Sequence, residues 1–224
     1  MKKKIALAGI AVFAALGSVA GLSAFEAYVI NVTAQIENAL FVHPEARDFG
    51  TMFPQEYKEL GFFVTFSESF STRDQDRVSK IDYQIKQKPK CADSVTNPTE
   101  FSKVTEDENG EFICQNPGHV MLPLLCPYLS KTPANLDGND VGIPAFHDPA
   151  AIATGTINKQ AAHVGDNWTI DLAVPCFEGQ CAQDWSLFVE SHNPDADPDE
   201  FMANPEDESK VFGCDLWVEV TRIY

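Results

Sequence analysis

The stretch KELGFFVTFSESF, residues 58–70, alternates apolar and polar side chains with a period of two. Its apolar face consists of Leu60, Phe62, Val64, Phe66 and Phe70. This period is typical of a β-strand that packs one face on a core and exposes the other to solvent. The stretch therefore predicts one strand of an antiparallel sheet with a buried side.

The same alternation recurs along the chain. It is present in VSKIDYQIKQK (78–88), AIATGTINK (151–159), NWTIDLAVPC (167–176), QDWSLFVES (183–191) and CDLWVEVTRIY (214–224). Residues 87–150 contain eight prolines and no long periodic run, and residues 192–210 are acidic and irregular. The pattern predicts an all-β, antiparallel jelly-roll or Ig-like sandwich of about seven to nine strands, with irregular insertions at 87–150 and 192–210.

The N-terminus has the features of an export signal. Three lysines precede an uncharged run from Ile5 to Ala24 that ends in small residues. We expect residues 1–24 to be a signal peptide cleaved after Ala24, with Ala27 as the second choice. An uncleaved membrane anchor and a pilin-type leader are the alternatives. We expect a single β-sandwich domain over 25–224, secreted to the extracellular space or cell surface, without stable membrane insertion after cleavage.

The net charge of the mature chain limits the classes of partner that it is expected to bind. Cleavage removes three lysines and leaves 13 basic against 33 acidic residues, which is a net charge of −20. We do not expect such an acidic surface to bind nucleic acid or anionic lipid. It favours solubility and the binding of divalent cations.

The cysteines predict a disulfide framework. They are Cys91, Cys114, Cys126, Cys176, Cys181 and Cys214, an even number after an export signal. Proximity suggests a Cys91–Cys114 bridge. We expect Cys214 to pair with Cys176 or Cys181, and Cys126 with the one that remains. No CxxC pair is present, so a zinc site is the weaker interpretation.

Catalytic motifs are not found. The histidines are His43, His119, His147, His163 and His192, and none belongs to an HExxH motif. The sequence also has no GxSxG elbow and no phosphate-binding loop of the Walker type. We therefore expect no enzyme activity and assign no catalytic residue. A hydrolase site assembled from distant residues is an alternative.

One acidic segment, NPDADPDEFMANPEDE at 193–208, carries a possible metal site. Its candidate calcium ligands are Asp195, Asp197, Asp199 and Glu206, which approach the spacing of a calcium loop. The alternative is a capped helix start with Asp197 as N-cap and Pro198 at the first position, continuing through Met202. Two glycosylation sequons, at Asn31 and Asn167, lie within expected strands, and we treat them as chance occurrences.

A long strand pattern begins almost at the cleavage site. Between Tyr28 and Val42 the even positions are mostly apolar, and those of its first part are Tyr28, Ile30, Val32, Ala34 and Ile36. Fifteen extended residues span roughly 50 Å, whereas a domain of this size is only some 40 Å across. The strand therefore either bends between two sheets or projects beyond its own domain. A projecting first part, residues 25–36, would be a donor strand that adds to another copy.

The order of features in residues 28–86 resembles the TasA/camelysin family of secreted biofilm-matrix proteins and its archaeal bundling-pilin relatives. The segments that carry the resemblance are NVTAQIENAL (31–40), FGTMFPQE (49–56), FFVTFSES (62–69) and VSKIDYQI (78–85), with a looser match in CDLWVEVTRIY. The resemblance implies a jelly-roll domain and fibres built by donation of an N-terminal strand. The six cysteines and the two irregular insertions depart from that pattern.

The expected function is a structural subunit of an extracellular fibre or biofilm matrix, whose partners are other copies of the same chain joined head to tail. A monomeric surface module that binds glycan or calcium is the first alternative. A secreted hydrolase is the second. Calcium is the one cofactor considered.

Overall fold

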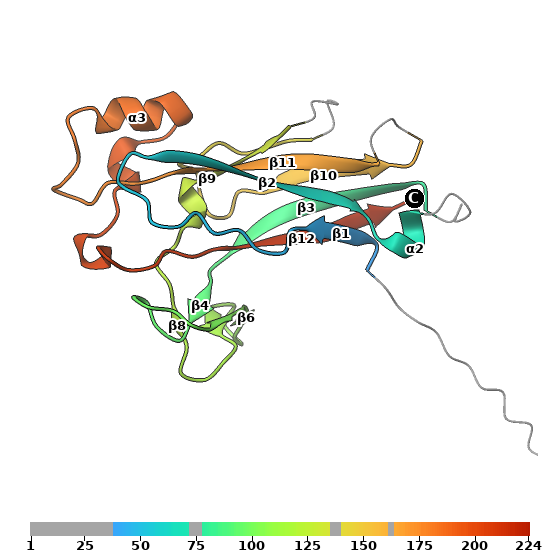
Figure 1. Cartoon of the computed structure of the whole chain (residues 1–224), viewed down its shortest axis with the longest axis horizontal. Helices are drawn as coiled ribbons and strands as arrows, with labels where there is room; N and C mark the ends of the chain where they lie inside the picture. The colour runs from blue at the N-terminus through green and yellow to red at the C-terminus, as the bar shows by residue number, and fades with distance from the viewer. Residues whose placement is uncertain (1–37, 72–77, 135–139, 161–163) are drawn as a thin grey trace, which may run out of the picture. The chain divides into compact units, whose positions relative to one another are not determined.

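A computed structural model describes residues 38–71, 78–134, 140–160 and 164–224, and residues 38–224 form one compact unit. Two antiparallel sheets make up its body (Figure 1). The first sheet has the order β1 (Leu40–His43), β2 (Tyr57–Phe66), β11 (Gly165–Ala173) and β9 (Leu129–Pro133). The second has the order β10 (Ala153–Asn158), β3 (Lys80–Lys88) and β12 (Asp215–Ile223). The predicted all-β fold is confirmed.

The core lies between these sheets and follows the predicted alternation. Its buried members from the long strands include Phe62, Val64, Phe66, Ile81, Tyr83, Ile85, Trp168, Ile170 and Leu172. Tyr83 joins the two layers, because its hydroxyl donates to Asp166 Oδ2 at 2.6 Å and accepts from Trp168 Nε1 at 2.7 Å. Gly155 faces the Tyr83 ring so closely that an added Cβ would lie 2.3 Å from it. A larger residue there would displace the tyrosine.

Short strands interrupt the stretch 87–150, which is otherwise irregular as expected. β4 (Cys91–Ala92), β5 (Phe101–Ser102) and β8 (Val120–Met121) form one small sheet, and β6 (Val104–Glu106) pairs with β7 (Phe112–Cys114). They gather at one end of the two large sheets (Figure 1). β9 is the exception, since it also lies between residues 87 and 150 but pairs with β11 in the first sheet.

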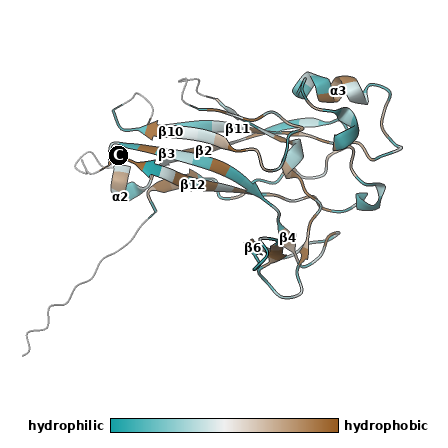
Figure 2. Ribbon diagram, turned by 180° about the vertical axis from the view of Figure 1, so that it is seen from behind, coloured by the Kyte–Doolittle hydropathy of each residue, from teal (hydrophilic) through white to brown (hydrophobic). Residues whose placement is uncertain are grey.

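The helices are short. They are α2 (Glu68–Ser71), α3 (Trp185–His192) and the 3-10 helices η1 (Cys126–Tyr128), η2 (Pro198–Phe201) and η3 (Pro205–Asp207). The strand predicted over 183–191 is wrong, because these residues form α3. Trp185 and Val189 are buried at a spacing of four, whereas Leu187 is 68% exposed. Figure 2 shows apolar and polar residues interspersed along α3.

Three disulfides are present, and they close loops of very different length. Cys91–Cys114 confirms the first predicted pair, but the others are Cys126–Cys214 and Cys176–Cys181. The predicted pairing of Cys214 with Cys176 or Cys181, and of Cys126 with the one that remains, is therefore wrong. Gly213, just before β12, exchanges backbone hydrogen bonds with Pro123 and Leu125, which brings η1 beside Cys214.

The environment that these bridges indicate is an oxidising one, such as the extracellular space. Of the helices among the described residues, none has the length and apolar character needed to cross a membrane.

Candidate functional site

A groove of about 610 Å³ opens between residues 42–49, the start of β12 and the small sheet. Its floor is apolar, since core residues of both large sheets reach it. The apolar and aromatic lining residues include Val42, Phe49, Phe62, Leu129, Ile170, Leu216, Trp217 and Val218. Charged side chains at the groove are Glu45, Arg47, Lys90, Lys103 and Asp215. The groove thus combines an apolar floor with charged groups of both signs.

β12 forms one wall of the groove and has an open edge. It pairs with β3 over its whole length, and no other described strand pairs with it. Leu216 and Val218 face the core but are only half-buried, and Val220 is 39% exposed. Their partners on β3, Ile85 opposite Val218 and Tyr83 opposite Val220, are buried. The inner face of β12 is therefore partly uncovered, and its edge can accept another strand.

The neighbouring edge of β2 is protected instead. β1 covers β2 only from Phe63 to Phe66. Beyond it, the Arg47 guanidinium donates to the Gly61 carbonyl through Nε at 2.6 Å and through its terminal nitrogen. Lys58 Nζ donates to the Phe49 carbonyl at 2.7 Å, which holds the strap 44–49 along β2. Because the strap covers the edge of β2, β12 is the long strand at this groove whose edge is exposed.

Cations on the outer face of β12 and β3 are held by partners. Lys88 Nζ lies 4.0 Å from the centre of the Trp217 ring, and Lys90 pairs with Asp215 at 3.5 Å. Lys86 pairs with Glu219 at 2.8 Å, and this contact holds the pKa of the Glu219 carboxyl below its usual value. The outer face of this edge is thus polar, in contrast to its inner face.

A second cavity lies on the outer face of the first sheet. Tyr57, Ser130, Asp171 and His192 line it, with the loop 140–145. Ser130 Oγ donates to Asp171 Oδ2 at 2.6 Å, and Asp171 stands directly across from Glu59. Burial, with the Glu59 charge as a further cause, raises the pKa of Asp171. The cavity offers an aromatic ring, hydroxyls and carboxylates to a polar ligand.

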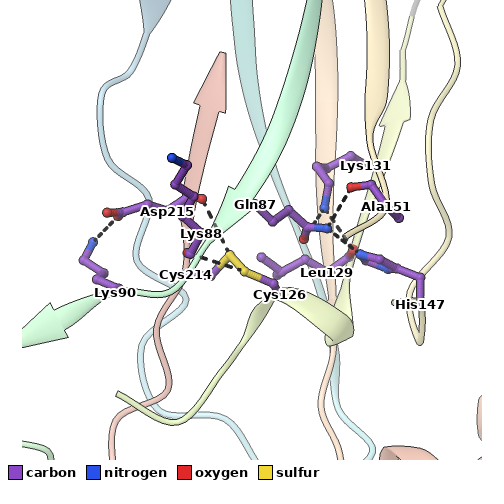
Figure 3. The surroundings of a disulfide bond; sticks show 10 residues. All are labelled: Gln87, Lys88, Lys90, Cys126, Leu129, Lys131, His147, Ala151, Cys214 and Asp215. Carbon is purple, nitrogen blue, oxygen red and sulfur yellow. Dashed lines mark hydrogen bonds and ion pairs between the residues drawn. A yellow bond between two sulfur atoms is a disulfide. The ribbon is translucent and has the colours of Figure 1, made fainter. Parts of the chain in front are cut away.

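A buried polar cluster lies near the Cys126–Cys214 bridge (Figure 3). Lys131 on β9 is 0% exposed, and its Nζ donates to Gln87 Oε1 at 2.9 Å and to the Leu129 carbonyl at 3.3 Å. Gln87 Nε2 lies 2.7 Å from His147 Nε2. Burial lowers the pKa of Lys131 to about 7. Burial, and then the Lys131 charge, lowers the pKa of His147 to about 4.

The four predicted calcium ligands do not converge. Asp197 caps η2, accepting from the Asp199 amide at 3.1 Å, while Glu206 lies in η3. Throughout the described part of the chain, no three acidic, histidine or cysteine side chains are placed to hold a metal ion, so no three of the four do. The capped start at Asp197 is confirmed, as a 3-10 helix that ends at Phe201. Prolines 198 and 205 begin separate turns, which spread the acidic side chains apart.

The predicted donor-strand face, from Tyr28 to Ile36, lies outside the described residues. Of the strand expected over 28–42, the structure describes β1, which begins at Leu40 and ends at His43, so residues 38 and 39 are not part of a strand, contrary to the expectation. The sequon residue Asn167 is exposed on β11, while Asn31 is outside the described part.

Several residues of these sites have no local sequence signal. Gln87, Lys131 and His147 are separated by 44 and 16 positions, and Tyr57 meets His192 from the far end of the chain, with ring centres 5.4 Å apart. Lys131 lies in β9, whose sequence LSKTP is mostly polar, so nothing local indicates that this lysine is buried.

Comparisons with protein-family models, with curated proteins and with solved structures find no match to this chain.

Proposed function

We propose that this chain is a secreted structural subunit of an extracellular fibre or matrix. The N-terminal segment 25–36 of one copy would add as a strand along β12 of the next copy. The observation that carries the proposal is the open edge of β12, whose apolar inner face is half-uncovered above a groove. The three disulfides support export, because such bridges persist in oxidising compartments.

The proposed donor and acceptor match in length and period. β12 has nine residues, or roughly 30 Å of extended chain. The apolar side chains of the donor recur at every second residue from Tyr28 to Ile36, a span of the same length. Main-chain hydrogen bonds would give affinity, and each buried apolar side chain would add roughly 1.5–3 kcal/mol. A contact of this head-to-tail kind extends into a filament unless it closes into a ring.

The test compares three forms of the mature chain by electron microscopy and sedimentation. Full-length protein is expected to polymerise with increasing concentration. A form without residues 25–36 is expected to stay a folded monomer, because it keeps the acceptor but has no donor. Adding a peptide of residues 25–36 to the shortened form should bind one equivalent without polymerising it.

Two matched substitutions localise the acceptor. Val220→Asp places a charge on the inner face of β12 and should block assembly. Val120→Asp makes the same exchange at an exposed position of β8, which belongs to another sheet than β12, and should leave assembly intact. A shortened form that polymerises, or a full-length chain that stays monomeric at every concentration and pH, would contradict the proposal. Unfolding of the shortened form would show instead that the segment pairs within its own subunit.

The cavity beside Tyr57 favours a second candidate, a surface module that binds glycan. Saccharides pair an apolar ring face with many hydroxyls, and the cavity has an aromatic ring beside Ser130 and Asp171. Calorimetry with soluble oligosaccharides would test this, with Tyr57→Ala as the site variant. Binding that Tyr57→Ala abolishes, in a chain that never polymerises, would favour the module over the fibre.

A further inference from the structure

Lys131 and Gln87 bring an amine and a carboxamide together inside the core. Lys131 belongs to β9 of the first sheet and Gln87 to β3 of the second, so the pair bridges the two layers. The amine nitrogen lies 2.9 Å from the amide oxygen. Figure 3 shows both side chains pointing toward one another, with His147 on the other side of the amide.

The position of Lys131 disfavours its charged form. Its side chain is fully buried, and no carboxylate among the described residues lies within ion-pair distance of its Nζ. Burying an ammonium without a counter-charge is costly, and the lysine is instead neutral for a substantial part of the time. A neutral amine carries the lone pair that makes it a nucleophile.

His147 is oriented by its other ring nitrogen. Nδ1 lies 2.6 Å from the Pro144 carbonyl, an acceptor only, so the hydrogen-bond network assigns the proton to Nδ1. The lone pair of Nε2 then faces Gln87 Nε2 at 2.7 Å. The Ala151 carbonyl, at 3.4 Å from Gln87 Nε2, helps to fix the amide with its nitrogen toward the histidine and its oxygen toward the lysine.

We propose that Lys131 and Gln87 condense into an intramolecular isopeptide bond, with His147 as the catalytic residue that transfers the proton. Lys131 Nζ attacks Gln87 Cδ, and a new C–N bond forms as the bond between Cδ and Nε2 breaks. His147 Nε2 takes a proton from the attacking nitrogen and gives it to the departing one, which leaves as ammonia. Atoms and charges balance, and no oxidant or second reactant is needed.

Two physical effects favour this reaction. The fold holds the reactants in contact, which raises their effective concentration far above that of free amine and amide. The product also replaces a costly buried amine with a neutral amide, and ammonia is lost to solvent. The reaction has to occur only once in the life of each chain, so a slow step suffices. This inference does not depend on strand addition.

The experiment is mass spectrometry of the mature full-length protein, denatured and with its disulfides reduced. We expect an intact mass lower than the sequence mass by one ammonia. Proteolysis should yield one branched peptide that joins the segments containing residues 87 and 131. Peptide mapping is essential because succinimide formation at Asn109–Gly110 would cause the same loss at another place.

Variants assign the roles. Lys131→Met keeps the length of the side chain but removes the amine, and it should have the full mass. Lys58→Met removes a lysine at the surface and should keep the loss. His147→Gln should slow the conversion at least tenfold, followed as mass against time in chains that are made unfolded as inclusion bodies, shown to have the full mass, and then refolded. A wild-type chain of full mass after prolonged incubation, or a loss that maps away from residues 87 and 131, would overturn the cross-link. Conversion of His147→Gln at the wild-type rate would overturn the role of His147.

Discussion

At the scale of single residues, His147 couples the stability of the fold to pH. Its folded pKa of about 4 lies below the 6.5 of an exposed histidine, first because of burial and then because of Lys131. Between these values the unfolded chain binds a proton that the folded chain does not. The stability that His147 contributes is therefore fully present above pH 6.5 and falls as the pH drops toward 4.

Replacing His147 should remove this dependence. The loss between pH 7 and pH 4 amounts to at most about 3 kcal/mol for one group with such a shift. Urea unfolding of the wild type and of His147→Gln at both pH values measures the difference. We expect the difference in free energy of unfolding between the wild type and His147→Gln to be smaller at pH 4 than at pH 7 by about that amount. Parallel behaviour would mean that His147 is not held neutral.

Phe146 is the central residue of an aromatic cluster. Its ring lies 5.6 Å from those of Trp185 and Phe201 and 6.0 Å from that of Phe188. Its backbone has a φ of +56°, which a residue other than glycine rarely adopts. The Phe146 carbonyl accepts from Asn193 Nδ2 at 2.7 Å, and this bond stabilises the unusual conformation.

Phe146→Ala should be strongly destabilising. Truncating a buried phenylalanine costs about 3–5 kcal/mol, because transfer energy is lost and a cavity remains. Phe53→Ala is the matched control, since Phe53 is 68% exposed, and it should change stability by less than about 0.5 kcal/mol. Urea denaturation of both variants makes the comparison. Similar values for the two would show that the cluster does not hold α3.

At the scale of elements, the three disulfides close loops of very different length. The separations are 88 residues for Cys126–Cys214, 23 for Cys91–Cys114 and 5 for Cys176–Cys181. The chain-entropy model gives stabilisations of about 4.5, 3.5 and 2 kcal/mol, respectively. Replacing each pair by two alanines and measuring urea unfolding should reproduce this order. A larger loss for Cys176–Cys181 than for Cys126–Cys214 would contradict the entropic explanation.

The sequence predicted the long strands well because each has a full alternating pattern. β2, β3 and β11 have nine or ten residues, so the period of two is unambiguous. α3 could not be predicted in this way. In its eight residues, Trp185 and Val189 fit a helical spacing of four as well as a spacing of two, and contact with Phe146 decides between them. β9 has only five residues and carries a buried lysine, which hides its pattern.

The candidate sites were less predictable than the strands. The groove wall at β12 follows from a predicted strand, but its open edge depends on which strands become neighbours. Cys126 and Cys214 meet only because Gly213 aligns with residues 123–125. The spacing of the acidic residues near Asp197 left a calcium loop and a capped helix start as alternatives, and the two prolines, which start separate turns, decide for the capped start. Contacts between residues that are far apart in the chain have no signal in the local sequence pattern.

At the scale of the whole molecule, net charge should govern the rate of assembly. Subunits of the expected mature form, with a net charge of −20, repel one another at low ionic strength. The screening length falls from about 30 Å at 0.01 M salt to about 8 Å at 0.15 M. We expect light scattering to show faster polymerisation at 0.15 M than at 0.01 M sodium chloride. Slower assembly at the higher salt would indicate attraction between oppositely charged faces.

The long register of β12 on β3 has a mechanical consequence. Residues from Asp215 to Ile223 pair with β3 side by side, with one shift of register between Val220 and Arg222. A pull along the strand axis loads these hydrogen bonds in shear, so that they resist together and do not open one after another as in a zipper. Directly ahead of β12, the Cys126–Cys214 bond transmits force to η1 without any hydrogen bond. A stretched subunit should therefore yield elsewhere before β12 slides.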